Sequence, residues 1–474
     1  MTVATTIVWF RQDLRVKDNP ALSWAVEQGK IVPVYIVDDR TEDRRDLGAA
    51  SQWWLHHSLD KLRSRLNQHL IIRRGDPATI LHELATECEA ENVVWNRCYQ
   101  PWQRQRDQQI KGRLKASGIS AKSFNGSLLW EPMTISKQDG GAYKVFTPYY
   151  RKGCLNADSP RYPLPSPERI TYLDNDVESL ELDALNLLPT LPWADDFSKH
   201  WTPGEEGAAT KLQRFISDAA RQYKSDRDIP SVVGTSRLSP HLRFGEISPN
   251  QVWYAILDKF GGRDNESIDT YLSELGWREF SYYLLYHWPE ITQTNFNEKF
   301  DKFPWNDEKE ALLAWQRGQT GIPIIDAGMR ELWQTGYMHN RVRMVVGSFL
   351  VKNLLQDWRK GEAWFWDCLV DADLASNTAS WQWVAGSGAD AAPYFRIFNP
   401  VLQGEKFDKQ GEYVRSYCPE LSSMPNKYIH KPWEAPEKVL AEANITLGKD
   451  YPKPIVDLKA SRQRALDAYE KVKG

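Results

Sequence analysis

Short hydrophobic runs alternate with helix-period segments through the first third of the chain. The runs, which we predict to be strands, are 5–10, 31–37, 70–73, 92–95 and 120–124. Between the later runs, hydrophobic residues recur at helical spacing over about 50–67, 77–90 and 102–117. Apolar strands that alternate with helices predict a parallel sheet covered on both faces. We therefore expect a doubly wound α/β domain over residues 1–128.

The pattern changes twice after this region. Between residues 129 and 203 lie nine of the chain's 27 prolines, mixed with short acidic stretches, and such sequence predicts a long interdomain linker. From 204 to 474 the hydrophobic spacing is helical almost throughout, which predicts a large all-α domain. No G-x-G-x-x-G follows the first strand and no P-loop is present, so a standard dinucleotide or triphosphate site is not expected.

Composition narrows the class of protein. A hydrophobic content of 41% and a charged content of 26% are typical of a soluble globular protein. No apolar run reaches membrane-spanning length and the chain opens directly into a strand-like run, so we expect neither a membrane span nor a secretory leader. The five cysteines are scattered, which indicates free thiols in a reducing compartment such as the cytoplasm. The nine histidines are dispersed as well, and we predict no metal site.

The segment from Asp371 to Trp383 holds the most distinctive chemistry. Asp371, Asp373 and Asn377 follow an apolar stretch (363–370), where buried carboxylates need a cation or a bound donor. Trp381 and Trp383 offer flat, oxidisable surfaces. The chain has 21 tryptophans, and 11 of them lie between residues 253 and 383. Most of them are expected to fill a helical core, but this segment indicates a redox-active heterocycle held in the interior.

A hydroxyl-rich loop, Gly234-Thr-Ser-Arg-Leu-Ser239, precedes Pro240. Ser239 followed by proline predicts a helix N-cap and first turn. The hydroxyls of Thr235, Ser236 and Ser239, with Arg237 and free backbone N–H groups, would form an anion cradle. Simple helix capping is the alternative explanation. Tyr223 and Arg227 precede the loop closely enough to close its other side.

Two further segments predict helix faces that carry polar chemistry. The first face contains Glu274, Trp277, Arg278 and Ser281. It lies in a segment too aromatic to be fully exposed, so it lines a cavity or, alternatively, carries an exposed Glu274–Arg278 pair. The second face contains Asn340, Arg343, Met344 and Gly347. Arg343 is the natural counter-ion for Asp371 or Asp373, although a purely structural salt bridge explains this pair equally well.

Three smaller features complete the set. Gly347 would allow a ring or backbone to approach closely. His339 has no second metal ligand at helical spacing and is expected to be a hydrogen-bonded core or active-site residue. Residues 390–407 interleave basic and amide side chains with aromatics, which on its own is a weak indication of a nucleic-acid edge.

Taken in order, these motifs resemble the DNA photolyase/cryptochrome family almost end to end. The similarity runs through Trp9-Phe-Arg-Gln-Asp-Leu-Arg15, the 234–239 loop, Trp277-Arg-Glu-Phe280, 320–327, Met338-His-Asn-Arg341 and Trp381-Gln-Trp383. Within the family the chain is most similar to bacterial cyclobutane pyrimidine dimer photolyases, in particular the class III branch related to plant cryptochromes. Asn377 is followed by Thr-Ala-Ser where many bacterial photolyases have Asn-Gly-Gly, which favours class III.

The resemblance implies FAD in the helical domain, with Asn377 at flavin N5 and Arg343 paired with Asp371. It assigns cofactor binding to Tyr223, Thr235, Ser236, Arg237, Leu238, Ser239, Arg278, Asn340, Arg343, Asp371, Ala372, Asp373 and Asn377. It also implies an antenna chromophore in the N-terminal domain. Trp102-Gln103 replaces the Asn-Glu of the best-known folate-binding enzymes, so methenyltetrahydrofolate is expected at a different place, with deazaflavin or flavin as alternatives.

The implied reaction is light-driven repair of pyrimidine dimers in UV-damaged DNA, by electron transfer from excited reduced flavin to a flipped-out lesion. The residues assigned to the lesion or DNA are Glu274, Trp277, Asn340, Arg341, Met344, Trp383 and Gln403. Glu274 would hydrogen-bond the dimer, and Trp381, Trp358 and Trp305 would re-reduce oxidised flavin. Because the net charge is −3, DNA binding requires a local positive strip, predicted at Arg341, Lys352, Arg396 and Lys406.

Two rival functions are open at this stage. A cryptochrome-type photoreceptor usually carries Asp where this chain has Asn377. A (6-4) photolyase requires a histidine pair where this chain has Met338-His339-Asn340. We expect a monomeric bacterial cytoplasmic enzyme.

Overall fold

The structure is a computed structural model that describes residues 4–39, 45–174, 177–391 and 395–473. The chain folds into two compact units. The first unit comprises Met1–Pro192, Trp201–Asp218 and Ser236–Pro289. The second comprises Trp193–His200, Ala219–Thr235 and Glu290–Gly474.

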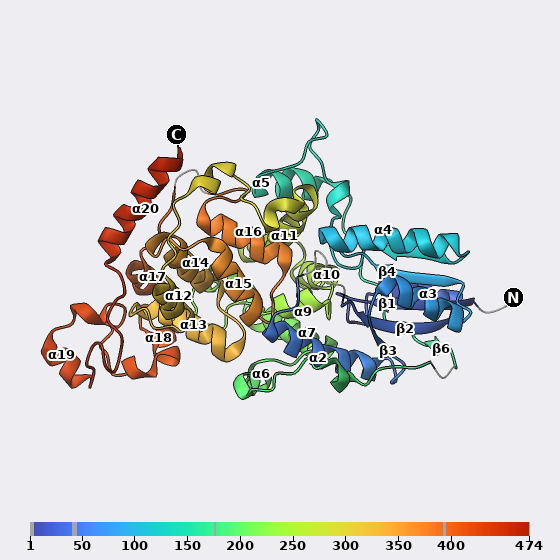
Figure 1. Ribbon diagram of the computed structural model, residues 1–474, viewed down its shortest axis with the longest axis horizontal. Helices are drawn as coiled ribbons and strands as arrows, with labels where there is room; N and C mark the ends of the chain where they lie inside the picture. Colours follow the sequence, from blue (N-terminus) through green and yellow to red (C-terminus); the bar gives the residue numbers. More distant parts are fainter. Residues whose placement is uncertain (1–3, 40–44, 175–176, 392–394, 474) are drawn as a thin grey trace. The chain divides into compact units, whose positions relative to one another are not determined.

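The first unit is built on a parallel sheet with the strand order β3-β2-β1-β4-β5 (Figure 1). The strands are β1 (Ala4–Phe10), β2 (Gly29–Val37), β3 (Ile71–Arg74), β4 (Asn92–Asn96) and β5 (Ser120–Phe124). All five predicted strands are confirmed, and so is the doubly wound class. A sixth strand, β6 (Thr171–Tyr172), pairs with β2 from within the proline-rich region and was not predicted, because two residues are too short for a period to be seen.

Four helices accompany the sheet: α1 (Pro20–Gln28), α2 (Ala49–Arg65), α3 (Pro77–Glu87) and α4 (Pro101–Ala116). The last three match the predicted helices. The helix α1 was not predicted, although it carries clear start signals, since the Asn19 side chain accepts a hydrogen bond from the Leu22 N–H and Pro20 follows the cap. Buried Ile7, Val34 and Val93 belong to the core beneath this layer.

The first unit also contains α5 (Phe146–Pro148), α7 (Glu205–Asp218), α9 (Ser239–Phe244), α10 (Pro249–Phe260) and α11 (Glu266–His287). Buried Arg15, from the Trp9–Arg15 motif, ties this helical part to the sheet. Its guanidinium donates hydrogen bonds to the carbonyls of Gly245 (2.9 Å) and Gly126 (2.6 Å). Gly245 has φ +70°, and a Cβ there would lie 2.5 Å from Asp13 Cα, so this turn requires glycine.

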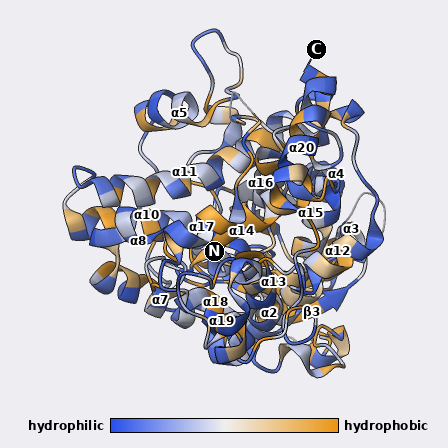
Figure 2. Cartoon of the chain, turned by 90° about the vertical axis from the view of Figure 1, so that its left-hand side faces the viewer, coloured by the Kyte–Doolittle hydropathy of each residue, from blue (hydrophilic) through white to orange (hydrophobic). Residues whose placement is uncertain are grey.

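The second unit is helical. Its helices are α6 (Phe197–His200), α8 (Tyr223–Asp226), α12 (Lys309–Gln316), α13 (Pro323–Thr335), α14 (Asn340–Ser348), α15 (Trp358–Cys368), α16 (Leu374–Ala385), α17 (Pro400–Phe407), α18 (Glu412–Tyr417), α19 (Glu437–Glu442) and α20 (Leu458–Lys473). The all-α prediction for the C-terminal part is confirmed. Individual helices carry both hydrophilic and hydrophobic residues (Figure 2), and among the described residues none is long and apolar enough to cross a membrane.

Candidate functional site

The loop before α9 has a backbone suited to binding an anion. Arg237 is left-handed (φ +49°), and Leu238, which follows it, is right-handed (φ −87°, ψ −4°). Adjacent residues of opposite hand turn successive N–H groups toward one point, which forms a concave anion site. The predicted N-cap at Ser239 was wrong by one residue, because Leu238 occupies the cap and Ser239 begins the helix. The predicted cradle therefore rests on the turn rather than on a hydroxyl cap.

Positive charge gathers beside this loop. Burial, followed by repulsion from Arg237 and Arg214, lowers the pKa of Lys211 to about 8. A bound anion would relieve this repulsion. The sequence alone did not identify Lys211, which lies on α7, more than twenty residues before the motif. The hydroxyl of Ser236, in turn, is hydrogen-bonded to buried Tyr271.

Tyr223 belongs to the second unit and is buried, with 6% of its surface exposed. The Arg227 guanidinium carbon lies 5.3 Å from the centre of its ring. In the same unit, a Cβ on Gly234 would lie 2.8 Å from Asp226 Cβ, so the chain passes close to α8 at this point. Tyr223 and Arg227 thus belong to one short helical turn, and their role in closing the other side of the 234–239 loop stays a prediction.

The polar face predicted on α11 is confirmed as helical. Glu274 and Trp277 are partly buried, and Ser281 is buried. The Trp277 ring stacks on Phe146, with centroids 3.8 Å apart and planes 12° apart. One face of the Trp277 indole is therefore covered by Phe146, and this stacking holds the indole in a fixed plane. Phe146 lies in the proline-rich segment, and no local pattern predicted this contact.

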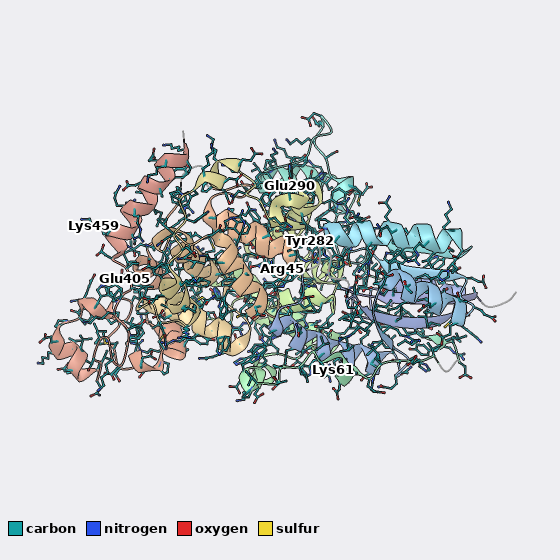
Figure 3. All side chains as sticks on the ribbon, viewed as in Figure 1. Arg45, Lys61, Tyr282, Glu290, Glu405 and Lys459 are labelled. Carbon is teal, nitrogen blue, oxygen red and sulfur yellow. The ribbon has the colours of Figure 1, made fainter. Side chains whose placement is uncertain are left out.

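The side chain of Arg278, on the same helix, is fixed by contacts with other residues of the first unit. Its Nη1 donates to the Ser127 carbonyl (2.9 Å) and to Glu279 Oε1 (3.1 Å). The guanidinium carbon also lies 5.0 Å from the ring centre of Tyr282, labelled in Figure 3. Three such contacts fix the guanidinium in one orientation, as a charged binding group requires.

Glu279 was not singled out from the sequence, although it is among the most buried acids of the chain. Its Oε2 accepts hydrogen bonds from the N–H groups of Leu129 (2.9 Å) and Trp130 (3.2 Å). Burial raises the pKa of Glu279 to about 7, although Arg278 and the two N–H groups act in the opposite direction. Its role is to bind the segment after β5 to α11.

In the second unit the predicted Arg343–Asp371 ion pair is confirmed, with Nη2 2.9 Å from Oδ2. Arg343 Nε also donates to the Met338 carbonyl (2.7 Å). Burial alone would lower the pKa of Arg343, but Asp371, Tyr337 and Glu331 together outweigh burial and raise it. His339 caps α14 by accepting the Arg341 N–H (3.2 Å), which agrees with the prediction of a hydrogen-bonded histidine.

Asn377 is buried on α16, and its amide orientation is set by a neighbour that the sequence did not identify. Nδ2 donates to the side chain of Glu362 (Oε1, 2.9 Å) and to its carbonyl (3.1 Å). Both amide protons thus have an acceptor, and the amide's remaining hydrogen-bonding capacity is acceptance at Oδ1. Asp373 caps the same helix, since its Oδ1 accepts the Ser376 N–H (2.8 Å).

Trp381 lies on α16 in close contact with α15. A Cβ on Gly361 would lie 2.5 Å from Trp381 Cζ3, so this glycine allows the indole to reach the α15 backbone. The indole also lies near Gly347, where a Cβ would be 3.6 Å from Cζ3, as the prediction of a nearby ring requires. Gly361 is nevertheless the position with less room for a side chain, and no sequence pattern marked it.

The other two predicted redox indoles lie on neighbouring segments. Trp358 begins α15 and is fully buried. It precedes Gly361 by three residues, which is about one helical turn. Trp305 is partly buried, and the next residue, Asn306, donates its N–H to the Leu355 carbonyl (2.6 Å) just before α15. The chain therefore places Trp381 against α15, Trp358 at the start of α15, and Trp305 beside the segment that leads into it.

Trp383 lines a small cavity of about 30 Å³ in the second unit, together with Phe300, Lys352, Phe395, Arg396 and Tyr469 among others. The prediction that Lys352 belongs to an exposed positive strip was wrong. Lys352 is 4% exposed, donates to the Arg396 carbonyl, and has a pKa lowered to about 7 by burial and by Arg396. Arg396 and Lys406 are exposed, as predicted. Residues 392–394 of the 390–407 motif lie outside the described residues.

Arg341 forms a two-point ion pair with Asp228 (2.8 and 3.2 Å), so its charge is partly neutralised within the chain. Asn340 is exposed, and Met344 and Gln403 are partly buried. All five cysteines are buried free thiols, and no cluster of His, Cys, Asp or Glu in the described parts of the chain could hold a metal ion.

Comparison with known proteins agrees with this geometry. Residues 6–168 match the family model described as DNA photolyase, and residues 271–471 match the FAD binding domain of DNA photolyase. The chain is 51% identical to the deoxyribodipyrimidine photo-lyase of Agrobacterium fabrum, over 100% of this chain and 99% of that protein. It is 37% identical to cryptochrome-2 of Arabidopsis thaliana, over 99% of this chain and 79% of that protein. A solved bacterial class III photolyase from Agrobacterium tumefaciens has a TM-score of 0.96 and 51% identity, covering 100% of this chain and 98% of that one.

This chain belongs to the DNA photolyase/cryptochrome family, and its C-terminal part is an FAD-binding domain of the photolyase type.

Proposed function

We propose that the protein is a deoxyribodipyrimidine photolyase that uses light to repair cyclobutane pyrimidine dimers in UV-damaged DNA. FAD, when bound, supplies a photoexcited reduced flavin that donates an electron to the lesion, and an oxidised flavin that accepts one from an indole. The full-length 51% identity to a deoxyribodipyrimidine photo-lyase carries this assignment. The assignment of individual residues rests on the family motifs and on the local geometry.

The residues present are chemically suited to FAD. The turn at Arg237–Leu238, with Lys211 nearby, suits a diphosphate, and the Arg343–Asp371 pair offers fixed charges to a polar ring. The orientation of Asn377 is the most specific feature. Because Glu362 takes both of its amide protons, Oδ1 remains to accept the N–H that flavin N5 carries in its reduced form. A neutral acceptor also tolerates an anionic reduced flavin better than a carboxylate would.

Two indoles and one carboxylate are assigned to the lesion. Trp277, held in its plane by Phe146, and Trp383, which lines the cavity in the second unit, would each offer a face to a flipped-out base. Glu274 would hydrogen-bond the dimer, and Met344 and Asn340 would contact it. Arg341 and Gln403 would bind the DNA backbone, so Arg341 would exchange Asp228 for a phosphate when DNA binds.

Three indoles are assigned to re-reduction of the flavin. Trp381 and Trp358 are buried, with 4% and 0% of their surfaces exposed, and Trp305 is partly buried, so the proposed path would lead from two buried indoles to one nearer the surface. We also assign an antenna chromophore to the N-terminal α/β domain, with methenyltetrahydrofolate preferred over deazaflavin or flavin. A monomeric, cytoplasmic enzyme of the class III branch is the form that we propose.

A blue-light photoreceptor is the second candidate, because the chain is also 37% identical to a plant cryptochrome. The two functions separate in one assay. Photoreduced protein is mixed with DNA that contains cyclobutane dimers and illuminated, and recovery of pyrimidine absorbance is followed. A photolyase restores the absorbance only in the light. Normal flavin photoreduction with both cyclobutane dimers and (6-4) photoproducts left intact would favour the photoreceptor.

A further inference from the structure

The middle indole of the proposed electron path, Trp358, has an unusual environment for a group that must carry positive charge. Its side chain is fully buried, so water does not solvate it. It is the first residue of α15, where the helix dipole is positive, and the Arg359 guanidinium carbon lies 4.8 Å from its ring centre. Each of these features disfavours a cation on the ring.

One contact acts in the opposite direction. Trp358 Nε1 donates a hydrogen bond to Asn295 Oδ1 (2.9 Å), and Asn295 is itself buried, with 4% of its surface exposed. Asn295 Nδ2 donates in turn to Asp301 Oδ1 (2.6 Å). The carboxylate polarises the amide and makes Oδ1 a stronger acceptor, because linked hydrogen bonds reinforce one another. Arg359 is partly neutralised, since its Nη1 lies 3.0 Å from Asp357 Oδ2.

We infer that Asn295, backed by Asp301, is a positioning residue that makes Trp358 an electron-relay station and keeps its indole proton in place. The inference deepens the proposed function and rests on it. After Trp381 has given an electron to the photoexcited oxidised flavin, Trp358 gives one electron to Trp381, which becomes neutral again. Trp358 is then a radical cation that retains its Nε1 proton, because an amide oxygen is too weak a base to take that proton.

The retained proton has a consequence for the next step. Trp358 recovers one electron from Trp305 and returns to its neutral form without having to regain a proton. Trp305 is partly exposed, so its own Nε1 proton can leave to water, and the charge is then trapped at the surface. A carboxylate in place of the Asn295 amide would remove the proton from Trp358 instead and stop the transfer at the middle of the path.

The test is Asn295→Asp in the FAD-loaded protein, with flash excitation of oxidised flavin and transient absorption to separate cationic from neutral tryptophan radicals. We expect the neutral radical to form at Trp358 and Trp305-dependent photoreduction to fall at least tenfold. Asn295→Ala removes the hydrogen-bond acceptor of Trp358. The radical cation should then favour Trp381 over Trp358 by roughly tenfold to a hundredfold more than in the wild type, the range of a hydrogen bond to a charged group. Asp301→Asn should give a smaller shift in the same direction.

Asn297→Asp is the matched control, because Asn297 lies in the same segment but caps Lys299 N–H instead of an indole. A flavin-free readout is the ¹⁵N-indole spectrum, in which the Trp358 N–H signal should exchange slowly in the wild type and faster in Asn295→Ala. If Asn295→Asp gives the same radicals and photoreduction rate as Asn297→Asp, the inference is overturned. If Trp358→Phe photoreduces like the wild type, it is instead the proposed electron path that fails.

Discussion

Replacing Gly361 with alanine tests how the structure places the first indole of the path. A Cβ at this position would lie 2.5 Å from Trp381 Cζ3 and 2.6 Å from Leu350 Cδ2. Both neighbours are buried, so they cannot move aside freely. Overpacking of this kind costs about 1–3 kcal/mol, while alanine in place of glycine in a helix returns about 1 kcal/mol. We expect Gly361→Ala to lower the free energy of unfolding by up to about 2 kcal/mol.

The chain supplies a matched control in Gly347→Ala. Gly347 is also helical and faces the same indole, but its added Cβ would be 3.3 Å from Val384 Cγ1 and 3.6 Å from Trp381 Cζ3. A small shift of these neighbours accommodates the added Cβ, so the higher helix propensity of alanine should dominate. The free energy of unfolding should be unchanged or raised by up to about 1 kcal/mol. Urea unfolding of both variants measures the difference. Flavin photoreduction should slow only in Gly361→Ala, while repair by chemically reduced enzyme continues. Equal unfolding midpoints for the two variants would refute the packing described for Trp381.

Three further predictions concern charge and electron transfer. The pKa of Glu279 is raised from 4.5 to about 7, so its contribution to stability is complete below pH 4.5 and is lost as the pH rises through 7. Unfolding measured across this range should show a loss of about 3 kcal/mol that Glu279→Gln abolishes. Glu274→Ala should retain lesion binding, measured by gel shift, but lower the repair quantum yield, and an unchanged yield would remove its proposed role. Trp381→Phe should block photoreduction of oxidised flavin while sparing repair after chemical reduction, and normal photoreduction would contradict the electron path.

The fold was largely predictable because its signals are local. The central strands β1, β2 and β4 are largely apolar runs, and the helical spacing after residue 204 is long and regular. The strand β6 was not predicted, because two residues carry no period, and the helix α1 was missed although Asn19 and Pro20 mark its start. The one-residue error at Ser239 arises because an N-cap shifts easily between neighbouring residues.

For the candidate site, sequence spacing identified side chains but not their partners. The Arg343–Asp371 pair was foreseen because a buried carboxylate requires a cation. The contacts of Glu362 with the Asn377 amide and of Asn295 with the Trp358 indole were not foreseen. Each joins residues from different segments, and nothing in the local sequence marks the contact. Lys352 was misplaced at the surface for a related reason, since a lysine is normally exposed unless tertiary contacts bury it.

The most direct test of the central claim is light-driven repair with the purified protein. DNA that carries only cyclobutane pyrimidine dimers and DNA that carries only (6-4) photoproducts are incubated separately with the reduced holoprotein, in darkness and in blue light. The account predicts recovery of pyrimidine absorbance for the cyclobutane substrate alone, and only in the light. Repair of the (6-4) substrate, or no light-dependent repair of the dimer by fully reduced protein, would contradict it.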